Sequence, residues 1–185
     1  MQYVIVGIGG QGILYSSRVL GHIALSRGEG VIGSEVHGMA QRGGSVISHF
    51  KMGDYQSPLV KAGDADVLLA FDQNEAVRNL HFLKQGGSAV VNTHDPSFLE
   101  NPSLVKWLAE RQVRVYPVMG YDILKAEMGS RFLFLNVLIL GALCGAGVGD
   151  VTIAEVREAV KALAPSKFVD DNLKAVDLGY AGTHR

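Results

Sequence analysis

Hydrophobic and polar positions fall in blocks that predict strands alternating with helices. Short apolar runs rich in β-branched residues, bounded by glycine or polar residues, indicate buried strands. Such runs occur at 3–6 (YVIV), 30–35 (GVIGSE), 65–71 (ADVLLAF), 86–92 (GGSAVVN) and 113–118 (VRVYPV). Residues 45–52 instead alternate with period two, which predicts a strand with unlike faces and places His49 at the surface or at an interface.

Helical periodicity fills the segments between these strands. The first predicted helix spans 12–28 and ends at Gly28, with one apolar stripe formed by Leu14, Val19, Leu20, Ile23 and Ala24. Further helices are predicted over 74–84 and 103–111, and one long or broken helix over 120–145. A last predicted helix begins at Thr152, which forms a capping box with Glu155, and ends before Pro165.

This order of elements predicts the fold class. Strands that alternate with helices favour a right-handed, Rossmann-like, doubly wound α/β fold, in which a mostly parallel sheet carries helices on both faces. The 185 residues suit one core. We find no repeat and no linker, so we expect a single domain over residues 1–185.

Composition narrows the classes of partner. Hydrophobic residues make up 48% and charged residues 19%, and 17 basic against 18 acidic residues give a net charge of −1. This balance gives no reason to expect nucleic-acid binding. The apolar segment 132–148 contains Asn136 and three glycines, so we expect a buried or subunit-facing helix and no membrane partner. The chain passes directly from Met1 into a strand, which favours a cytoplasmic location.

Cys144 is the only cysteine in the sequence. It lies in an apolar run, where an inert buried thiol is the ordinary interpretation and a reactive thiol the alternative. One cysteine allows neither a disulfide within the chain nor an iron–sulfur cluster, which needs about four thiolates.

The first strand leads into a glycine loop, GIGGQG, with glycines at 7, 9, 10 and 12. Its spacing between a strand and a helix is typical of loops that present backbone N–H groups to a phosphate. Close packing of the helix on the sheet explains the same glycines. Glu35, near the end of the second strand, could accept hydrogen bonds from the hydroxyls of a ribose. A stand-alone NAD or flavin enzyme therefore remains an alternative.

The segment 34–50, SEVHGMAQRGGSVISHF, adds a second glycine-bearing loop. Together with GIGGQG, SPLV, ADVLLAF and LNVLILGAL it resembles the gamma-type subunits of 2-oxoacid:acceptor oxidoreductases over most of the chain. The form VHGMAQRGG is similar to the indolepyruvate ferredoxin oxidoreductase beta subunit. Gamma subunits of the pyruvate, 2-oxoglutarate and ketoisovalerate enzymes are the related alternative.

The resemblance implies a multisubunit enzyme that oxidatively decarboxylates an aryl 2-oxoacid to an acyl-coenzyme A. It implies that thiamine diphosphate, Mg²⁺ and 4Fe-4S clusters belong to a large partner subunit, which passes electrons to ferredoxin. Neither VGDV nor MGDY in this chain fits a thiamine motif, since the first lies close to the end of the chain and the second in a predicted turn. We therefore expect no activity from this chain alone. A homodimer is a further arrangement that the sequence allows.

The candidate binding residues lie in the two glycine loops. We expect Gly43 and Gly44 to bring backbone close to a neighbour or ligand, and Arg42 to supply a planar fork for a phosphate or carboxylate. Gln11 and Gln41 would add directional amide contacts near shared coenzyme A. The predicted cofactor-binding set is Gly7, Gly9, Gly10, Gln11, Gly12, Gln41, Arg42, Gly43 and Gly44. A loop that only braces two strands, with Arg42 paired to Glu35, is the alternative and would make the chain a scaffold.

Glu35, His37, Met39 and Asn136 are predicted interface residues. His37 could act as an acid or base, but an interface histidine is the favoured interpretation, and we predict no catalytic residue. His22, His81, His94 and His184 show no metal-ligand spacing, so no metal site is predicted. Asn136, Gly141 and Gly145 leave room for another element to approach the apolar helix.

Overall fold

A computed structural model describes residues 1–37 and 43–183, which form one three-layer α/β structure. Within these residues six strands make a single sheet in the order β2-β3-β1-β4-β5-β6. The strands are β1 (Gln2–Ile8), β2 (Val31–His37), β3 (Ser45–Met52), β4 (Ala65–Ala70), β5 (Leu83–Asn92) and β6 (Arg114–Val118).

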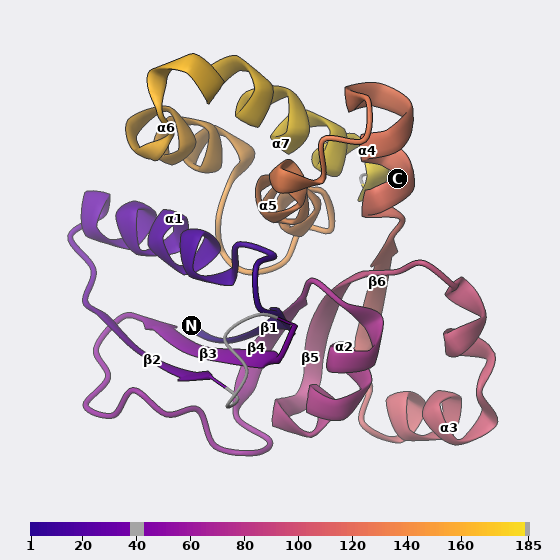
Figure 1. Cartoon of the computed structure of the whole chain (residues 1–185). Coiled ribbons are helices and arrows are strands. Elements are labelled where there is room, and N and C mark those ends of the chain that lie inside the picture. Colours follow the sequence, from indigo (N-terminus) through magenta and orange to yellow (C-terminus); the bar gives the residue numbers. More distant parts are fainter. Residues whose placement is uncertain (38–42, 184–185) are drawn as a thin grey trace.

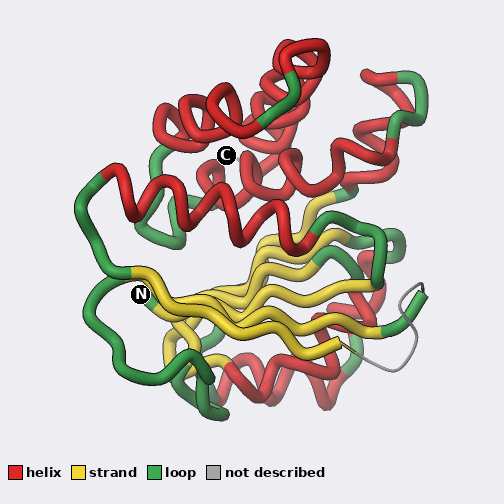
Figure 2. The backbone as a smooth tube through the Cα atoms, turned by 60° about the vertical axis from the view of Figure 1, so that its left-hand side comes forward, coloured by secondary structure: helices red, strands yellow, loops and turns green. Residues whose placement is uncertain are grey.

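Helices cover both faces of the sheet (Figures 1 and 2). One face carries α1 (Ile13–Ser26), α4 (Gly120–Met128), α5 (Leu135–Gly145), α6 (Ile153–Leu163) and α7 (Val169–Thr183). The other carries α2 (Gln73–Asn79) and α3 (Pro102–Glu110). The apolar side chains accordingly form two cores, one on each side of the sheet. The predicted fold class is therefore confirmed.

Strand β3 is the exception to the parallel order. β1, β4, β5 and β6 pair in parallel, whereas β3 lies antiparallel between β1 and β2. The connection from His37 to Ser45 is too short for the crossover that parallel neighbours require, since such crossovers take about a dozen residues or more. β2 and β3 therefore form a hairpin, and the second glycine loop is its connection.

The prediction that His49 of β3 lies at the surface or at an interface was wrong. His49 is only 6% exposed, because residues after β3 return over that face and the backbone N–H of Val60 donates to His49 Nδ1 at 3.2 Å. Lys51 is buried to the same degree, and its ammonium lies 5.1 Å from the centre of the Tyr55 ring. Both faces of this strand are therefore covered.

Two helix predictions need correction. Leu14 does not belong to the buried stripe of α1 and is 41% exposed, because the stripe begins at Ile13. The helix predicted over 74–84 ends at Asn79, and a 3₁₀ turn, η1 (Leu80–Phe82), leads directly into β5. Of the two alternatives for 120–145, the broken helix is the one observed, with Gly129 in the left-handed conformation at the end of α4.

Helices α6 and α7 pack on the other helices that cover the same face of the sheet. The predicted capping box of Thr152 and Glu155 is present at the start of α6, and Arg27 at the end of α1 donates to both carboxylate oxygens of Glu155 at 2.6 and 2.8 Å. Helix α7, which the sequence analysis did not predict, crosses α5 at the small residues Gly141 and Gly145. The expected close approach at these glycines is therefore confirmed.

Candidate functional site

In the glycine loop after β1, close packing leaves no room for a side chain at two of the glycine positions. A Cβ atom on Gly7 would lie 2.6 Å from Gln11 Oε1 and 2.9 Å from Phe71 Cβ. Gly12, which begins α1 with φ 82°, would meet Asn136 Nδ2 at 2.5 Å. Gly10 differs, because it has φ 102° and nothing within 4 Å of its Cβ position. Packing thus explains Gly7 and Gly12, whereas Gly10 leaves open space above the loop.

Gln11 closes this loop on itself and joins it to two other segments. Its Oε1 accepts from the N–H of Ile8 at 2.7 Å, and its Nε2 donates to Phe71 O at 3.2 Å and to Tyr121 Oη at 2.9 Å. Both N–H groups of the amide are thereby engaged within the chain. The structure places Gln11 as a brace between the ends of β1, β4 and the start of α4.

The two glycine loops lie side by side. The N–H of Gly9 donates to Gly44 O at 2.9 Å, which joins the loop after β1 to the residues before β3. Gly43 has φ 77° and open space at its Cβ position. Met39, Gln41, Arg42 and the side chain of His37 lie outside the described part of the chain. The bond between Gly9 and Gly44 nevertheless shows that the described ends of the two loops are in contact.

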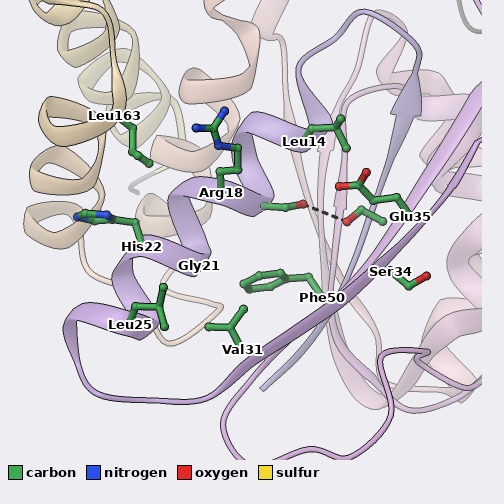
Figure 3. Close-up of a pocket in the computed structure, with 13 residues that line it drawn as sticks. Leu14, Arg18, Gly21, His22, Leu25, Val31, Ser34, Glu35, Phe50 and Leu163 are labelled. Carbon is green, nitrogen blue, oxygen red and sulfur yellow. Dashed lines mark hydrogen bonds between the residues drawn. The ribbon is translucent and has the colours of Figure 1, made fainter.

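Two neighbouring cavities lie between this junction and α1. The glycine-loop pocket, about 520 Å³ in volume, is lined by Gly9, Gly10, Gly12, Ile13, Leu14, Tyr15, Arg18 and Val46. The α1 groove, about 690 Å³, lies between α1 and the strands β2 and β3 (Figure 3). Leu14 and Arg18 line both cavities, so the two cavities adjoin at these residues.

Charged side chains of both signs line the α1 groove. Arg18 projects from α1 and Glu35 from β2 (Figure 3), and both are exposed. Within the described residues no ion pair engages the Arg18 guanidinium. The Ser17 and Ser48 hydroxyls, 3.0 Å apart, bridge α1 and β3. An anionic ligand that follows the groove would therefore meet one unengaged guanidinium.

Arg18 was missed by the sequence analysis. It stands four residues after Leu14 and four before His22, so these three share a helix face that is separate from the buried stripe. The sequence did contain a signal for this site, because Arg18 lies on the same exposed face of the helix as the apolar residue Leu14. Asn136, a predicted interface residue, is instead half-buried against Gly12 and accepts from the N–H of Val137 at 2.9 Å.

Tyr15 adds an unusual feature beside the glycine-loop pocket. Its hydroxyl is buried and has no hydrogen-bond partner within the described residues. Burial raises the pKa of this phenol, while the nearby charge of Arg18 lowers it to a smaller extent. The hydroxyl therefore keeps its proton at neutral pH and offers a donor.

The topology does not provide the usual dinucleotide arrangement. In that arrangement the acid follows a strand that neighbours the glycine-loop strand. Here β3 separates β2 from β1, so Glu35 lies two strand spacings away, about 10 Å across the sheet. The register also pairs Glu35 with Ser48, and Ser48 with Ile5, below the level of the glycine loop. Glu35 is therefore poorly placed to hold a ribose beside that loop.

The remaining chemical candidates are inert. Burial raises the pKa of the Cys144 thiol to about 12, so the thiol stays protonated at neutral pH, as an inert cysteine would. No cluster of three or more histidine, cysteine or acidic side chains suited to a metal ion occurs within residues 1–37 and 43–183. In the same residues no helix has the length and apolar character needed to cross a membrane.

Comparison with known proteins identifies the family to which this chain is similar. The family model for pyruvate ferredoxin/flavodoxin oxidoreductase matches residues 2–182. The indolepyruvate oxidoreductase subunit IorB of Archaeoglobus fulgidus is 37% identical, covering 97% of this chain and 94% of the relative. IorB of Pyrococcus horikoshii is 36% identical, covering 95% and 92%.

Solved structures show the same fold. The gamma subunit of the keto/oxoacid ferredoxin oxidoreductase from Geobacter sulfurreducens superposes with a TM-score of 0.74 at 24% identity, covering 98% of this chain and 97% of that one. A 2-oxoglutarate:ferredoxin oxidoreductase from Magnetococcus marinus gives a TM-score of 0.77 at 21% identity, over 99% of this chain but 31% of that one. The match to this second structure is thus one part of a longer chain.

The fold and its paired glycine loops define a gamma-type oxidoreductase subunit. The chain belongs to the pyruvate ferredoxin/flavodoxin oxidoreductase family. Within it the chain is a small subunit of a multisubunit 2-oxoacid ferredoxin oxidoreductase, similar to the indolepyruvate type. The enzyme class expected from the sequence is confirmed.

Proposed function

We propose that this chain is the subunit without thiamine or clusters in an indolepyruvate-type ferredoxin oxidoreductase, and that its glycine-loop edge forms the subunit interface and part of the coenzyme A site. The observation that carries the proposal is the bond from Gly9 to Gly44, which brings both glycine loops together beside the glycine-loop pocket that Gly9 lines. Identities of 30–37% to indolepyruvate subunits, against 26–28% to 2-oxoglutarate and ketoisovalerate subunits, support the choice of oxoacid.

The groove residues fit a coenzyme A molecule in its chemistry. Coenzyme A joins anionic phosphates to a long, less polar arm, and the groove joins the Arg18 guanidinium to apolar residues such as Leu14 and Leu25. Arg18 would bind phosphate as a planar donor. Gly10 leaves room for backbone and ligand to approach each other, and the unpartnered Tyr15 hydroxyl marks an unsatisfied donor beside the same pocket.

When bound, coenzyme A would supply the thiol that accepts the acyl group. The residues of this chain would hold and orient it, while a large partner subunit would contain thiamine diphosphate, Mg²⁺ and the 4Fe-4S clusters and would contact ferredoxin. The structure from Magnetococcus marinus, described as holding 2-oxoglutarate, coenzyme A and succinyl-CoA, supports this assignment through its fold. Arg42, in the loop next to Gly43, is proposed as a second donor to the ligand.

The test is coenzyme A kinetics of the assembled complex. Arg18→Gln should raise the KM for coenzyme A about tenfold, because it removes one charge-assisted contact worth about 1.4 kcal/mol, and should leave kcat nearly unchanged. Arg42→Ala should act in the same direction. Lys106→Gln, on α3 across the sheet, is the matched control with one lost cation.

Assembly is measured alongside by co-purification of the two subunits. If neither arginine substitution changes the KM for coenzyme A in a complex that still assembles, the chain is a scaffold without ligand contact. A scan over aryl, short aliphatic and dicarboxylic oxoacids with the wild-type complex decides between the indolepyruvate type and its pyruvate, 2-oxoglutarate and ketoisovalerate alternatives.

A further inference from the structure

Helices α2 and α3 lie on the opposite face of the sheet from α1 (Figure 1). A further cavity is lined by residues of the segment α2–η1, of α3 and of the chain before α3. Its volume is about 500 Å³. The residues that line it, called here the α2–α3 groove, are Val77, Arg78, Leu80, His81, Phe98, Asn101, Ser103, Leu104 and Trp107. None of them belongs to the glycine-loop pocket or to the α1 groove.

The floor of the α2–α3 groove is apolar and partly aromatic. Helix α3 has no fully buried residue, although it is amphipathic, and it turns Leu104 and Trp107 toward the groove. Leu80 and Phe98 complete the floor. An amphipathic helix normally buries its apolar stripe against the protein. On α3 the apolar stripe, which includes Leu104 and Trp107, is only partly buried. The floor therefore offers aromatic and aliphatic surface to a ligand.

The rim of the groove is cationic. Arg78 is 71% exposed, and its ion pair with Glu75 uses Nη1 at 2.6 Å, which leaves the rest of the guanidinium fork available. Glu75 itself is 5% exposed and does not line the groove. His81 Nδ1 lies 3.1 Å from Arg78 O, so Nδ1 carries the hydrogen of that bond and the ring is fixed beside the arginine. The groove's described lining contains no acidic side chain.

We propose that the α2–α3 groove binds a small aromatic carboxylate. Its volume falls in the range of about 300–1,000 Å³ that is usual for small-molecule sites. A planar ring would pack against Trp107 and Phe98, because aromatic pairs prefer offset or edge-to-face contact. The carboxylate would accept from the guanidinium of Arg78, whose planar fork matches two carboxylate oxygens. An apolar floor with a cationic rim complements both halves of such a molecule.

Trp107 reports on this site directly. It is the single tryptophan of the chain, so fluorescence excited at its absorption edge comes from the groove alone. The full chain is titrated with phenylacetate, which does not absorb at that wavelength, and separately with benzyl alcohol and with acetate. We expect a saturable emission change with phenylacetate, a response at least about fivefold weaker in affinity with benzyl alcohol, and none with acetate.

Two substitutions test the rim. Arg78→Lys keeps a positive charge near Glu75 but removes the fork, and should weaken phenylacetate binding by about threefold or more. Arg78→Gln removes the charge together with the fork and should weaken phenylacetate binding further. Lys106→Gln removes an exposed cation on α3 that does not line the groove, and should leave the affinity unchanged.

Two results would overturn the proposal. One is equal affinity for phenylacetate and benzyl alcohol, or an affinity unaffected by either rim substitution, since the cationic rim would then play no part. The other is an absence of any saturable response to phenylacetate, together with a shift of Trp107 emission when the partner subunit is added. That pair of findings would show a protein covering the groove in place of a small molecule.

Discussion

His49 is an imidazole held in its neutral form by one backbone contact. Because its Nδ1 accepts from Val60 N–H, this nitrogen must be unprotonated in the folded chain. Burial lowers the pKa of His49, and the charge of Lys51 lowers it further. Phe82 packs edge-on at 5.3 Å between ring centres. Protonation would turn the acceptor into a donor and break the contact with Val60.

This histidine should make folding pH-dependent in one direction. The folded pKa lies below the unfolded value of about 6.5, so between the two pKa values the unfolded chain binds more protons. The contribution of neutral His49 to the free energy of unfolding is therefore complete above about pH 6.5, and it falls as the pH drops toward the folded pKa. Urea unfolding at pH 7.5 and 5.5 should show a larger loss for wild type than for His49→Gln. Equal losses in the two proteins would contradict this assignment.

Single residues show where prediction from sequence ends. The glycine loops could be predicted, because their spacing after a strand is a local signal. The burial of His49 could not, since its cover comes from Val60 and Phe82, eleven and 33 positions further along the chain. Gln11 was predicted as an amide contact to a ligand, whereas its hydrogen bonds to Phe71 and Tyr121 depend on the fold as a whole.

At the scale of elements, the contact between α5 and α7 depends on glycine in both helices. A Cβ atom on Gly179 of α7 would overlap the carbonyl oxygen of Leu138, and it would also lie 3.0 Å from the N atom of Ala142. On the α5 side, Gly141 meets the carbonyl oxygen of Val176 in the same way. All of these neighbours are backbone atoms of the facing helix, so no side-chain rotation can relieve the overlap.

Gly179→Ala should therefore separate the two helices. We expect a loss of about 3 kcal/mol in the free energy of unfolding, at the upper end for overpacking. Gly182→Ala on the same helix is the matched control, because its nearest neighbour is the flexible Cδ1 of Ile123 at 3.2 Å. There the gain in helix propensity, about 1 kcal/mol, offsets the mild crowding. Similar unfolding midpoints in urea for both variants would argue against the backbone overlap.

The elements themselves were predicted unevenly. A strong local signal identified the capping box at Thr152, whereas the position of the break at Gly129 was left open. Helix α7 escaped notice because Gly179 and Gly182, poor helix formers in isolation, lie within it and are there to admit α5. The end of α2 was placed too late because Leu80 and Leu83 continue a helical spacing, although Leu83 is already a buried strand residue of β5.

At the scale of the whole molecule, the antiparallel position of β3 sets the geometry of the site. It moves β2 and Glu35 away from the glycine loop, and it makes the second glycine loop a hairpin connection that meets the first loop through Gly9 and Gly44. The alternation of strands and helices predicted the sheet but not this insertion. The shortness of the link from β2 to β3 was the overlooked signal, since it excludes a parallel pair.

The single cysteine of the sequence decides where an iron–sulfur cluster can lie. One thiol cannot hold a cluster that needs about four thiolates, so a cluster that accepts electrons from an oxoacid must lie in another polypeptide. The purified chain, given indolepyruvate, coenzyme A, thiamine diphosphate, Mg²⁺ and ferredoxin, should therefore reduce no ferredoxin. Co-expression with the large partner subunit should restore reduction that depends on both the oxoacid and coenzyme A.

The partner subunit assayed alone separates the two contributions. If this chain provides part of the coenzyme A site, the partner alone should react with the oxoacid but show little stimulation of ferredoxin reduction by coenzyme A. Adding the wild-type chain should restore that stimulation, and adding the Arg18→Gln chain should restore it only at about tenfold higher coenzyme A. Reduction of ferredoxin by this chain without a partner would refute the division of labour, because it would require a redox centre that a single protonated cysteine cannot form.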